Sequence, residues 1–480
     1  MQVSPARQRM ARLAWLFIEK FGLIFLSIFS FFAFALLLTP NELGLAVLLL
    51  AIAELFSFFF SSTIDNSMIG MKKISKSDDG TVFWTGLIST SILACVLWVL
   101  LSTFYFQEAE SSILMVALLF LPLQSLSRIH IIHLRRAGEF KSLAQRTLLG
   151  KLLGLCCGIY VAYIGYGAWG LVTQAIVMSF TSASLLMLTC RRSVPFTFDI
   201  DLIKDLSLVG VPAAVKSISS NFVEKGLIFA LDITLGSAAV GFFNFANRLV
   251  QLPKKAIHSA LMTYGHPVFS RKAKSESPDA EKLLSNFFLD ATQIAVYLAA
   301  PIFIGFAIIG EALVGVIFPE RWAAAASLIL PISVMAAISF SLTFLPSILV
   351  AKKVTKKALI PEIITTIMAI LFVFMTSEHY GLMSAVWALI IKLAIMLPIN
   401  TQVITSICVF SVKRYLLVLL KPVLACGVLC GSLLAYITYL PLQDVIDITL
   451  IVNIGGFVYL GSVLALEPTI IKRIRRFVSE

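Results

Sequence analysis

The residues with the clearest chemical potential lie inside one apolar stretch, residues 209–234, which is long enough to cross a bilayer. At the helical angle its polar side chains fall on one half of the circumference: Lys216, Ser217, Ser220, Asn221, Glu224, Lys225 and Asp232. A charge facing lipid at the bilayer centre costs at least about 2.5–3.5 kcal/mol. The polar half must therefore face protein or water. Two interpretations stay open: buried ion pairs that join helices, or a charged cavity for a polar, anionic cargo.

The composition of the whole chain places these charges in a polytopic membrane protein. Of 480 residues, 59% are hydrophobic and 13% are charged, and the mean hydropathy is +0.95. Most of the 38 lysines and arginines lie in short connections between apolar stretches, so the net charge of +12 is a topology signal rather than a sign of nucleic-acid binding. The seven cysteines lack metal-ligand spacing, so no metal site and no cofactor are predicted.

Hydropathy predicts about fourteen helical spans and an all-α fold. The spans are residues 14–38, 43–66, 82–106, 112–133, 147–165, 168–190, 209–234, 238–262, 284–309, 323–350, 358–376, 381–403, 415–438 and 445–466. Connections on one side are nearly free of Lys and Arg, whereas those on the other side are basic, including the one that holds Lys254, Lys255, Arg271 and Lys272. The positive-inside rule then places both termini in the cytoplasm.

The connections also bear on the class of function. None exceeds about 25 residues, which leaves no room for a catalytic domain, and no Walker loop for ATP is present. We therefore predict a secondary carrier and not an enzyme.

A short motif repeats at equivalent places in two halves of the chain. Residues 38–45 join the first two spans, residues 235–242 join the seventh and eighth, and both contain a glycine in the same register, Gly44 and Gly241. This indicates two parallel six-span repeats with the cargo site between them. The predicted parts are an N-lobe at residues 1–194, a C-lobe at 195–410, and two further spans with a basic tail at 411–480.

Local motifs together with the arrangement of six, six and two spans resemble the polysaccharide-transporter family of the MOP (MATE-like) exporter superfamily. These are the Wzx-type flippases, and the colanic-acid exporter branch is the most similar. The motifs are Phe83-Trp84, residues 135–140 (RRAGEF), residues 241–253 (GFFNFANRLVQLP), residues 266–270 (HPVFS) and residues 318–322 (FPERW). The resemblance covers roughly residues 10–420, and its most specific part is residues 241–270.

The resemblance implies a function and a fold. The expected protein moves undecaprenyl-diphosphate-linked oligosaccharide units of O-antigen, capsule or exopolysaccharide from the cytoplasmic to the periplasmic leaflet of a bacterial inner membrane. Two six-helix bundles would surround a cationic cavity and work by alternating access. Expected partners are this lipid-linked oligosaccharide, membrane lipids, protons or sodium ions, and the polysaccharide polymerase and chain-length machinery.

Spans one, seven and eight line the cavity in this family, which assigns roles to residues of this chain. The predicted diphosphate-binding cations are Arg248, Lys216, Lys225 and Lys20. The predicted sugar-binding amides are Asn244, Asn247 and Asn221. The predicted ion-coupling carboxylates are Glu224, Glu54 and Asp232. Each set has a structural alternative: Lys20 can snorkel to the interface, the amides can join helices, and Glu224 can neutralise Arg248 or Lys216.

Three other functions compete with this hypothesis. A MATE-type drug or cation antiporter has twelve spans and an acid-dominated cavity. A lipid II flippase has a similar architecture, with more arginines in its first span, where this chain has Lys20 alone. An integral-membrane polysaccharide polymerase or ligase would have a large periplasmic loop, which the predicted topology lacks.

Overall fold

A computed structural model describes residues 5–71, 73–190, 194–273, 279–352, 354, 356–440, 444–471 and 473. Side chains are described for these residues except 5–13, 62, 66, 70, 209–221, 280 and 356. Every regular element in the described part is a helix. Twelve of these helical stretches are long and apolar enough to cross a membrane, which confirms an all-α, multi-pass membrane protein.

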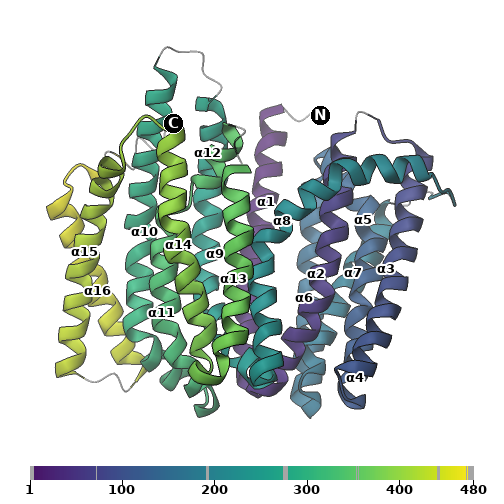
Figure 1. The fold of residues 1–480 in the computed structure, drawn as a ribbon, viewed down its shortest axis with the longest axis horizontal. Helices are drawn as coiled ribbons and strands as arrows, with labels where there is room; N and C mark the ends of the chain where they lie inside the picture. Colours follow the sequence, from purple (N-terminus) through teal and green to yellow (C-terminus); the bar gives the residue numbers. More distant parts are fainter. Residues whose placement is uncertain are drawn as a thin grey trace. The chain divides into compact units, whose positions relative to one another are not determined.

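The chain divides into two compact units, residues 1–241 and 242–480 (Figure 1). The first contains α1 (Pro5–Leu37), α2 (Pro40–Gly70), α3 (Lys76–Phe104), α4 (Glu108–Leu118), α5 (Phe120–Ala137), α6 (Phe140–Val161), the π-helix η1 (Ala162–Tyr166), α7 (Trp169–Cys190) and α8 (Ile200–Leu235). Helix α9 (Ser237–Ala273) begins in the first unit and continues into the second.

The second unit adds seven α-helices and two short 3-10 helices. They are α10 (Ala280–Ile317), η2 (Glu320–Trp322), α11 (Ala323–Ser339), η3 (Phe340–Leu342), α12 (Leu345–Ala351), α13 (Lys356–Tyr380), α14 (Met383–Ile407), α15 (Val412–Tyr439) and α16 (Val445–Leu466). The lobe boundaries that the repeat predicts, 194/195 and 410/411, stay a prediction, and contacts place α8 in the first unit.

The twelve membrane-spanning stretches correspond to predicted spans one to six and nine to fourteen. Helices α8 and α9, of 36 and 37 residues, occupy the places of the seventh and eighth. Helix α9 continues beyond residue 262, the predicted end of span eight, so Arg271 and Lys272, expected in the connection that follows, lie inside the helix. The helix continues because only two isolated prolines, Pro253 and Pro267, interrupt a sequence that is otherwise compatible with a helix.

Two predicted spans are broken rather than continuous. Residues 112–133 form α4 and α5, separated at Leu119, because Pro122 has no N–H to bond the carbonyl of Leu118. Residues 323–350 form α11, η3 and α12, and Pro346 in the first turn of α12 has the same effect on the carbonyl of Leu342. Broken helices are tolerated in membranes where protein or a polar cavity satisfies the freed backbone groups.

Short polar caps define where several helices begin and end. Thr39 and Glu42 form a capping box at the start of α2, with Pro40 in its first turn, and Ser75 and Asp78 form another at the start of α3. At the other end of α2, Arg136 Nη1 donates to the carbonyl oxygens of Met68 (3.0 Å) and Met71 (2.6 Å). The basic last turn of α5 therefore neutralises the carbonyl end of α2.

The repeated motifs meet in the first unit. A Cβ added to Gly44 of α2 would overlap the carbonyl oxygen of Ser237 at the start of α9. A Cβ added to Gly241 of α9 would overlap the carbonyl oxygen of Pro40 at the start of α2. Each glycine thus lies against the carbonyl four residues before the other, and only glycine permits so close a crossing of two helices.

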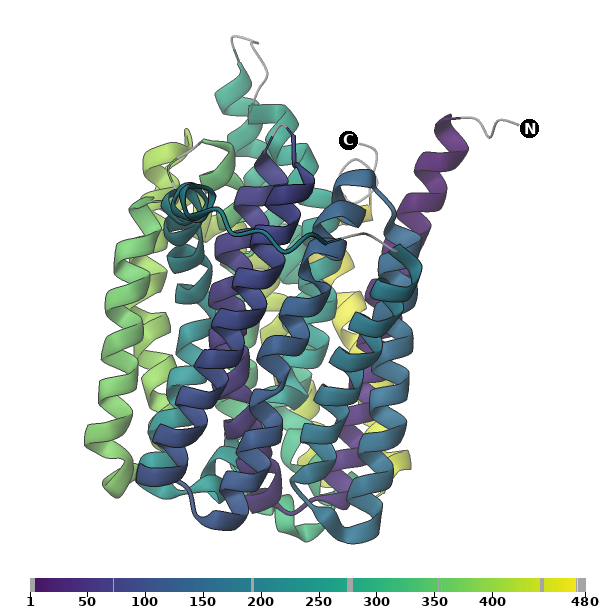
Figure 2. The ribbon, with the colours of Figure 1, turned by 90° about the vertical axis from the view of Figure 1, so that its right-hand side faces the viewer.

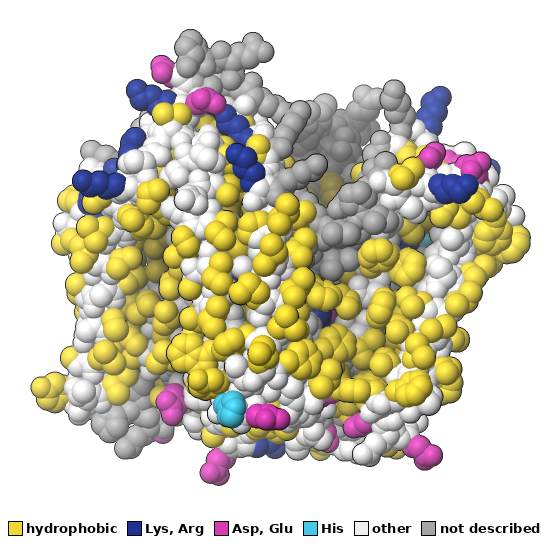
Figure 3. Space-filling model, viewed as in Figure 1, with side chains coloured by type: hydrophobic (Ala, Val, Ile, Leu, Met, Phe, Trp, Pro, Cys, Tyr) yellow, Lys and Arg dark blue, Asp and Glu magenta, His cyan; other side chains and the backbone are white. Residues whose placement is uncertain are grey.

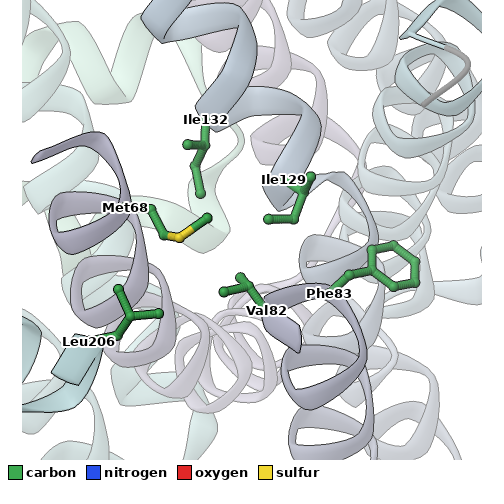
Figure 4. Packing of buried hydrophobic residues seen from close by; sticks show 6 residues of the cluster. All are labelled: Met68, Val82, Phe83, Ile129, Ile132 and Leu206. Carbon is green, nitrogen blue, oxygen red and sulfur yellow. The ribbon is translucent and has the colours of Figure 1, made fainter. Parts of the chain in front are cut away.

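In the first unit, α2 packs against α8, α5 packs against α3 and α7, and α6 packs against α7 and α1. The first turns of α8 run across the other helices before α8 turns along them (Figures 1 and 2). There Leu206 completes an apolar cluster with Met68 of α2, Val82 and Phe83 of α3, and Ile129 and Ile132 of α5 (Figure 4). This cluster packs the start of α8 against the ends of α2, α3 and α5.

An aromatic cluster in the second unit joins two of the family-like motifs. Trp322 is fully buried, and its ring stacks on Phe245 of α9 with centroids 4.3 Å apart, while Phe318 packs edge-on against the same phenyl ring at 4.9 Å. Helix α10 packs against α11 and α15, α15 packs against α16, and α13 pairs with α14. On the face shown in Figure 3, apolar side chains cover the middle of each unit's helices, with lysine and arginine toward one end.

Candidate functional site

An ion pair joins helices α2 and α8 of the first unit. Lys225 of α8 donates from Nζ to Oε2 of Glu54 of α2 at 2.6 Å. The side chain of Lys225 is 19% exposed and that of Glu54 is 49% exposed. Glu54 lies about halfway along α2, so the pair stands far from either end of that helix. Of the predicted site residues, these two are the acid and the cation that the structure brings together.

The ion pair lines a cavity of about 350 Å³ within the first unit. Its lining residues are Glu54, Leu55, Ser57, Phe58 and Ser61 of α2, Phe120 and Gln124 of α5, and Lys225 of α8. Glu54, Ser57, Phe58 and Ser61 are spaced by three or four residues, which places them on one face of α2. The cavity thus combines a carboxylate, an ammonium group, hydroxyls, an amide and two aromatic rings.

The broken fourth span builds the α5 side of this cavity. Phe120 and Gln124 both belong to the first turns of α5, directly after the break at Leu119. Gln124 Nε2 donates to Ser179 Oγ of α7 at 3.3 Å, which holds the amide against the cavity wall. Sequence analysis missed Gln124, Phe120, Ser57 and Phe58. Ser57 and Phe58 could have been found from the sequence, because they lie on the same helical face as Glu54. Nothing in the sequence indicates that Phe120 and Gln124 line the same cavity.

Asp232, predicted to couple ions, lies near the end of α8. Its carboxylate accepts hydrogen bonds from Tyr105 Oη at 2.5 Å and from Ser237 Oγ at 2.7 Å. These bonds tie the end of α3 to the α8–α9 turn, in which Gly236 has a φ of 81°. Burial, together with the hydrogen bond to Asp232, raises the pKa of Tyr105 above its ordinary value, so this hydroxyl stays protonated as a donor. The arrangement holds a turn together, and ion coupling by Asp232 stays a prediction.

The remaining predicted residues lie elsewhere. Asn244 and Arg248 are half-buried on α9, and Asn247 is buried there with Oδ1 accepting from Gln251 Nε2 at 3.4 Å. These residues belong to the second unit. Lys20 is exposed on α1.

Three further predicted site residues belong to α8. Glu224 is half-buried next to Lys225, and it makes no ion pair with a residue whose side chain is described. The side chains of Lys216 and Asn221 lie outside the described residues. Their predicted roles stay predictions.

A second charged group of the first unit lies nearer the basic helix ends. Asp65 faces the buried Arg128 at 3.7 Å and the more exposed Arg135 at 4.0 Å. Asp65 lies inside α2, which continues to Gly70. Nearby, His133 Nε2 lies 2.7 Å from Oδ1 of the buried Asp79.

The second unit has its own ion pair between spans. Lys392 Nζ of α14 donates to Glu362 Oε1 of α13 at 2.6 Å and to Thr366 Oγ1 at 3.0 Å. Lys392 and Glu362 lie 30 positions apart on neighbouring helices. This compact three-way contact between adjacent helices fits a structural role.

A cluster of charged side chains beyond the last span joins the end of the chain to the second unit. Glu467 is 3% exposed, and its carboxylate accepts from Lys421 Nζ at 2.7 Å and faces Arg473 at 3.5 Å. Burial alone would raise the pKa of Glu467, but the bond from Lys421 and the charge of Arg473 together hold that pKa below its ordinary value. Arg473 also donates to Gln293 Oε1 at 2.7 Å. The residues after α16 are thereby attached to α10 and α15.

Comparison with known proteins gives two relatives of low identity. Succinoglycan biosynthesis transport protein ExoT of Rhizobium meliloti (strain 1021) is 22% identical over 64% of this chain and 62% of its own length. Teichuronic acid biosynthesis protein TuaB of Bacillus subtilis (strain 168) is 18% identical over 81% of each chain. The chain therefore spans less than two thirds of the first of these relatives.

Solved structures show the same fold. The lipid II flippase MurJ in an inward closed conformation superimposes with a TM-score of 0.77 at 14% identity, covering 96% of this chain and all of that one. An inward-facing multidrug resistance MATE family transporter of the MOP superfamily gives a TM-score of 0.58 at 16% identity, over 80% of this chain and 95% of that one. The named neighbours are flippases and transporters rather than enzymes.

The family described as polysaccharide biosynthesis protein matches residues 33–327, which is more than half of the chain. That range contains the α2–α8 ion pair, the cavity and all five of the family-like motifs. The chain belongs to the polysaccharide biosynthesis protein family, and its fold is that of the lipid II flippase and the MATE family transporter named above.

Proposed function

We propose that this protein flips undecaprenyl-diphosphate-linked oligosaccharide units from the cytoplasmic to the periplasmic leaflet of a bacterial inner membrane. The observation that carries the proposal is the polar cavity of the first unit, with Lys225 and Glu54 at mid-helix depth. Charged groups at this depth are costly unless they serve a pathway or a buried contact. A lipid-linked glycan is a cargo whose polar head needs such a pathway.

The comparisons support the class of cargo. The family carries the description polysaccharide biosynthesis protein, one relative is named a succinoglycan biosynthesis transport protein, and a flippase for lipid II has the same fold. Polysaccharide units are assembled on a lipid whose head cannot cross hydrocarbon unaided. Both termini and the basic connections would then face the cytoplasm, and a polymerase with its chain-length machinery would act on the exported units.

Carboxylates within the membrane make ion coupling part of the proposal. Glu54 lies on α2 and Glu224 lies on α8, the two helices joined by the ion pair. Either carboxylate can exchange a proton or hold a sodium ion during a transport cycle. Transport should then respond to a proton or sodium gradient. A response that persists unchanged in both Glu54→Gln and Glu224→Gln would remove these residues from the coupling mechanism.

Reconstitution of the full-length protein in liposomes tests the function directly. Undecaprenyl diphosphate bearing a fluorescent oligosaccharide is placed in both leaflets, and an enzyme added outside removes the label from accessible molecules. We expect complete removal in vesicles that contain the protein and about half removal in empty vesicles. Half removal in both would overturn the proposal. Lipid II and ethidium, tested in parallel, report the lipid II flippase and drug antiporter alternatives.

The predicted phosphate-binding cations are tested in cells. Arg248→Ala and Lys216→Ala should leave normal amounts of protein in the membrane while lipid-linked precursor accumulates and surface polysaccharide falls. Lys204→Ala is a matched control, because Lys204 is an exposed lysine whose neighbour is Asp201, three residues away on the same helix. Normal export in both cation variants would remove these two residues from the transport path without overturning the liposome result.

A further inference from the structure

Among the lining residues whose side chains the structure describes, the cavity of the first unit has one positive and one negative group. Lys225 is its cation and Glu54 is its anion, and 2.6 Å separates the ammonium nitrogen from the carboxylate oxygen. Lys225 is therefore already neutralised, and the half-exposed carboxylate of Glu54 faces any ligand that enters. A diphosphate has only acceptor oxygens and negative charge, so the carboxylate would repel it. The charge balance argues against a phosphate subsite here.

The other lining groups suit a ligand that both donates and accepts hydrogen bonds. Gln124 offers an amide, and Ser57 and Ser61 offer hydroxyls. The carboxylate of Glu54 is able to accept hydrogen bonds from neighbouring hydroxyl groups of a ligand. The rings of Phe58 and Phe120 supply flat apolar surfaces against which the C–H faces of a ring can pack. Sugars present this combination of hydroxyls and apolar ring faces.

The position of the break in the fourth span supports a ligand site independently. Pro122 leaves the carbonyl of Leu118 without its helical donor, and the break at Leu119 brings Phe120 and Gln124 to the cavity wall. Discontinuous helices within the membrane occur where backbone is buried in protein or lines a cavity. The volume, about 350 Å³, lies within the range of small-molecule sites.

We infer that this cavity is a saccharide subsite, which binds a sugar ring of the lipid-linked oligosaccharide and leaves the diphosphate to cations elsewhere in the chain. The inference rests on the proposed function, and it alters the role that the sequence assigned to Lys225. Lys225 orients the Glu54 carboxylate toward sugar hydroxyls instead of binding phosphate. Gln124, held by Ser179, is a sugar-binding amide.

Two probes that differ only in the sugar separate the possibilities. The first is undecaprenyl diphosphate carrying N-acetylglucosamine, and the second is undecaprenyl diphosphate without sugar. Binding of each to the purified full-length protein in detergent is measured by tryptophan fluorescence. We expect Gln124→Leu to weaken binding of the glycosylated probe by about 3- to 10-fold, the effect of one or two hydrogen bonds. Binding of the sugar-free probe should change by less than about twofold.

A second variant and a control guard against a trivial loss of folding. Phe120→Leu keeps an apolar side chain at the cavity wall. It should weaken binding of the glycosylated probe and leave binding of the sugar-free probe unchanged, because a leucine offers no flat ring face. Gln402→Ala removes an amide from an exposed position of α14 in the second unit and should change neither affinity.

The outcomes distinguish this inference from the proposed function. Equal weakening of both probes in Gln124→Leu and Phe120→Leu would assign the cavity to the diphosphate and overturn the inference. Unchanged affinity for both probes in both variants would show that no sugar contacts this cavity, and would also overturn it. In either case wild-type protein that still flips the labelled oligosaccharide in liposomes retains the proposed function. Wild-type protein that flips nothing fails the proposed function itself.

Discussion

Removing either partner of the Lys225–Glu54 pair should destabilise the protein by an amount set by how much of the remaining charge water can reach. Fully exposed pairs contribute about 0.2–1 kcal/mol, whereas a lone charge left in a buried pair costs about 3–5 kcal/mol. Here Lys225 is 19% exposed and Glu54 is 49% exposed, so both single variants fall between these limits. We expect about 1 kcal/mol for Lys225→Met and about 2 kcal/mol for Glu54→Gln, which leaves the less exposed charge unpaired.

The double variant tests the cause of the loss. Lys225→Met combined with Glu54→Gln contains no lone charge, so it should recover most of the loss, with a coupling energy of about 1–2 kcal/mol. The free energy of unfolding is measured by denaturant titration of the purified protein, followed by tryptophan fluorescence. The control cycle is Lys204→Met with Asp201→Asn, whose side chains are 68% and 92% exposed and should couple by less than about 0.5 kcal/mol. Additive losses at Lys225 and Glu54 would refute the reasoning.

Three further predictions follow from other contacts. Gly44→Ala should sharply reduce the folded protein recovered from membranes, by size-exclusion chromatography, because the added methyl overlaps backbone; Gly427→Ala, with open space around it, should not. The depressed pKa of Glu467 means that its contacts stabilise the protein above the ordinary carboxyl pKa and are lost as pH falls through the lower folded-state value. The protection of amides just after α16 against hydrogen exchange, corrected for the pH dependence of the intrinsic exchange rate, should therefore be constant from pH 7 to about 5 and fall below about pH 4. Glu467→Gln should abolish that pH dependence, and an unchanged profile would contradict the assignment. Asp65→Asn should cost about 3–5 kcal/mol by denaturant titration, because it leaves Arg128 buried and unpaired, and a loss below about 1 kcal/mol would show that water reaches Arg128.

The spans and the fold class were predictable because they depend on local apolar runs. A stretch of about 20 apolar residues must be helical in a membrane whatever surrounds it, since no water is present to satisfy its backbone. The breaks at Leu119 and at residues 340–344 were not predicted, although each has a proline within three residues. Proline does not always break a membrane helix, as Pro253 in α9 shows, so tertiary contacts decide.

The candidate site was predictable in part. The polarity of the α8 span identified Lys225, and the position of Glu54 deep within the second span identified that carboxylate. Their pairing, however, joins residues 171 positions apart. No local pattern specifies which of several cations a carboxylate meets, because that depends on helix packing. The same limit explains why Gln124 and Glu362 were missed: an amide or acid near the start of a span looks like an interfacial residue until its neighbours are known.

The crossing of Gly44 with Ser237, and of Gly241 with Pro40, has a consequence for how this sequence can change over time. Two copies of one motif meet here in the manner of a twofold-symmetric dimer interface, in which a patch contacts its own equivalent. A bulkier residue at position 44 must then be accommodated by a change in residues 237–241, and a bulkier residue at position 241 by a change in residues 40–44. The two motifs cannot diverge independently, so these positions should co-vary between the halves of related chains even where the surrounding helices have lost all trace of duplication.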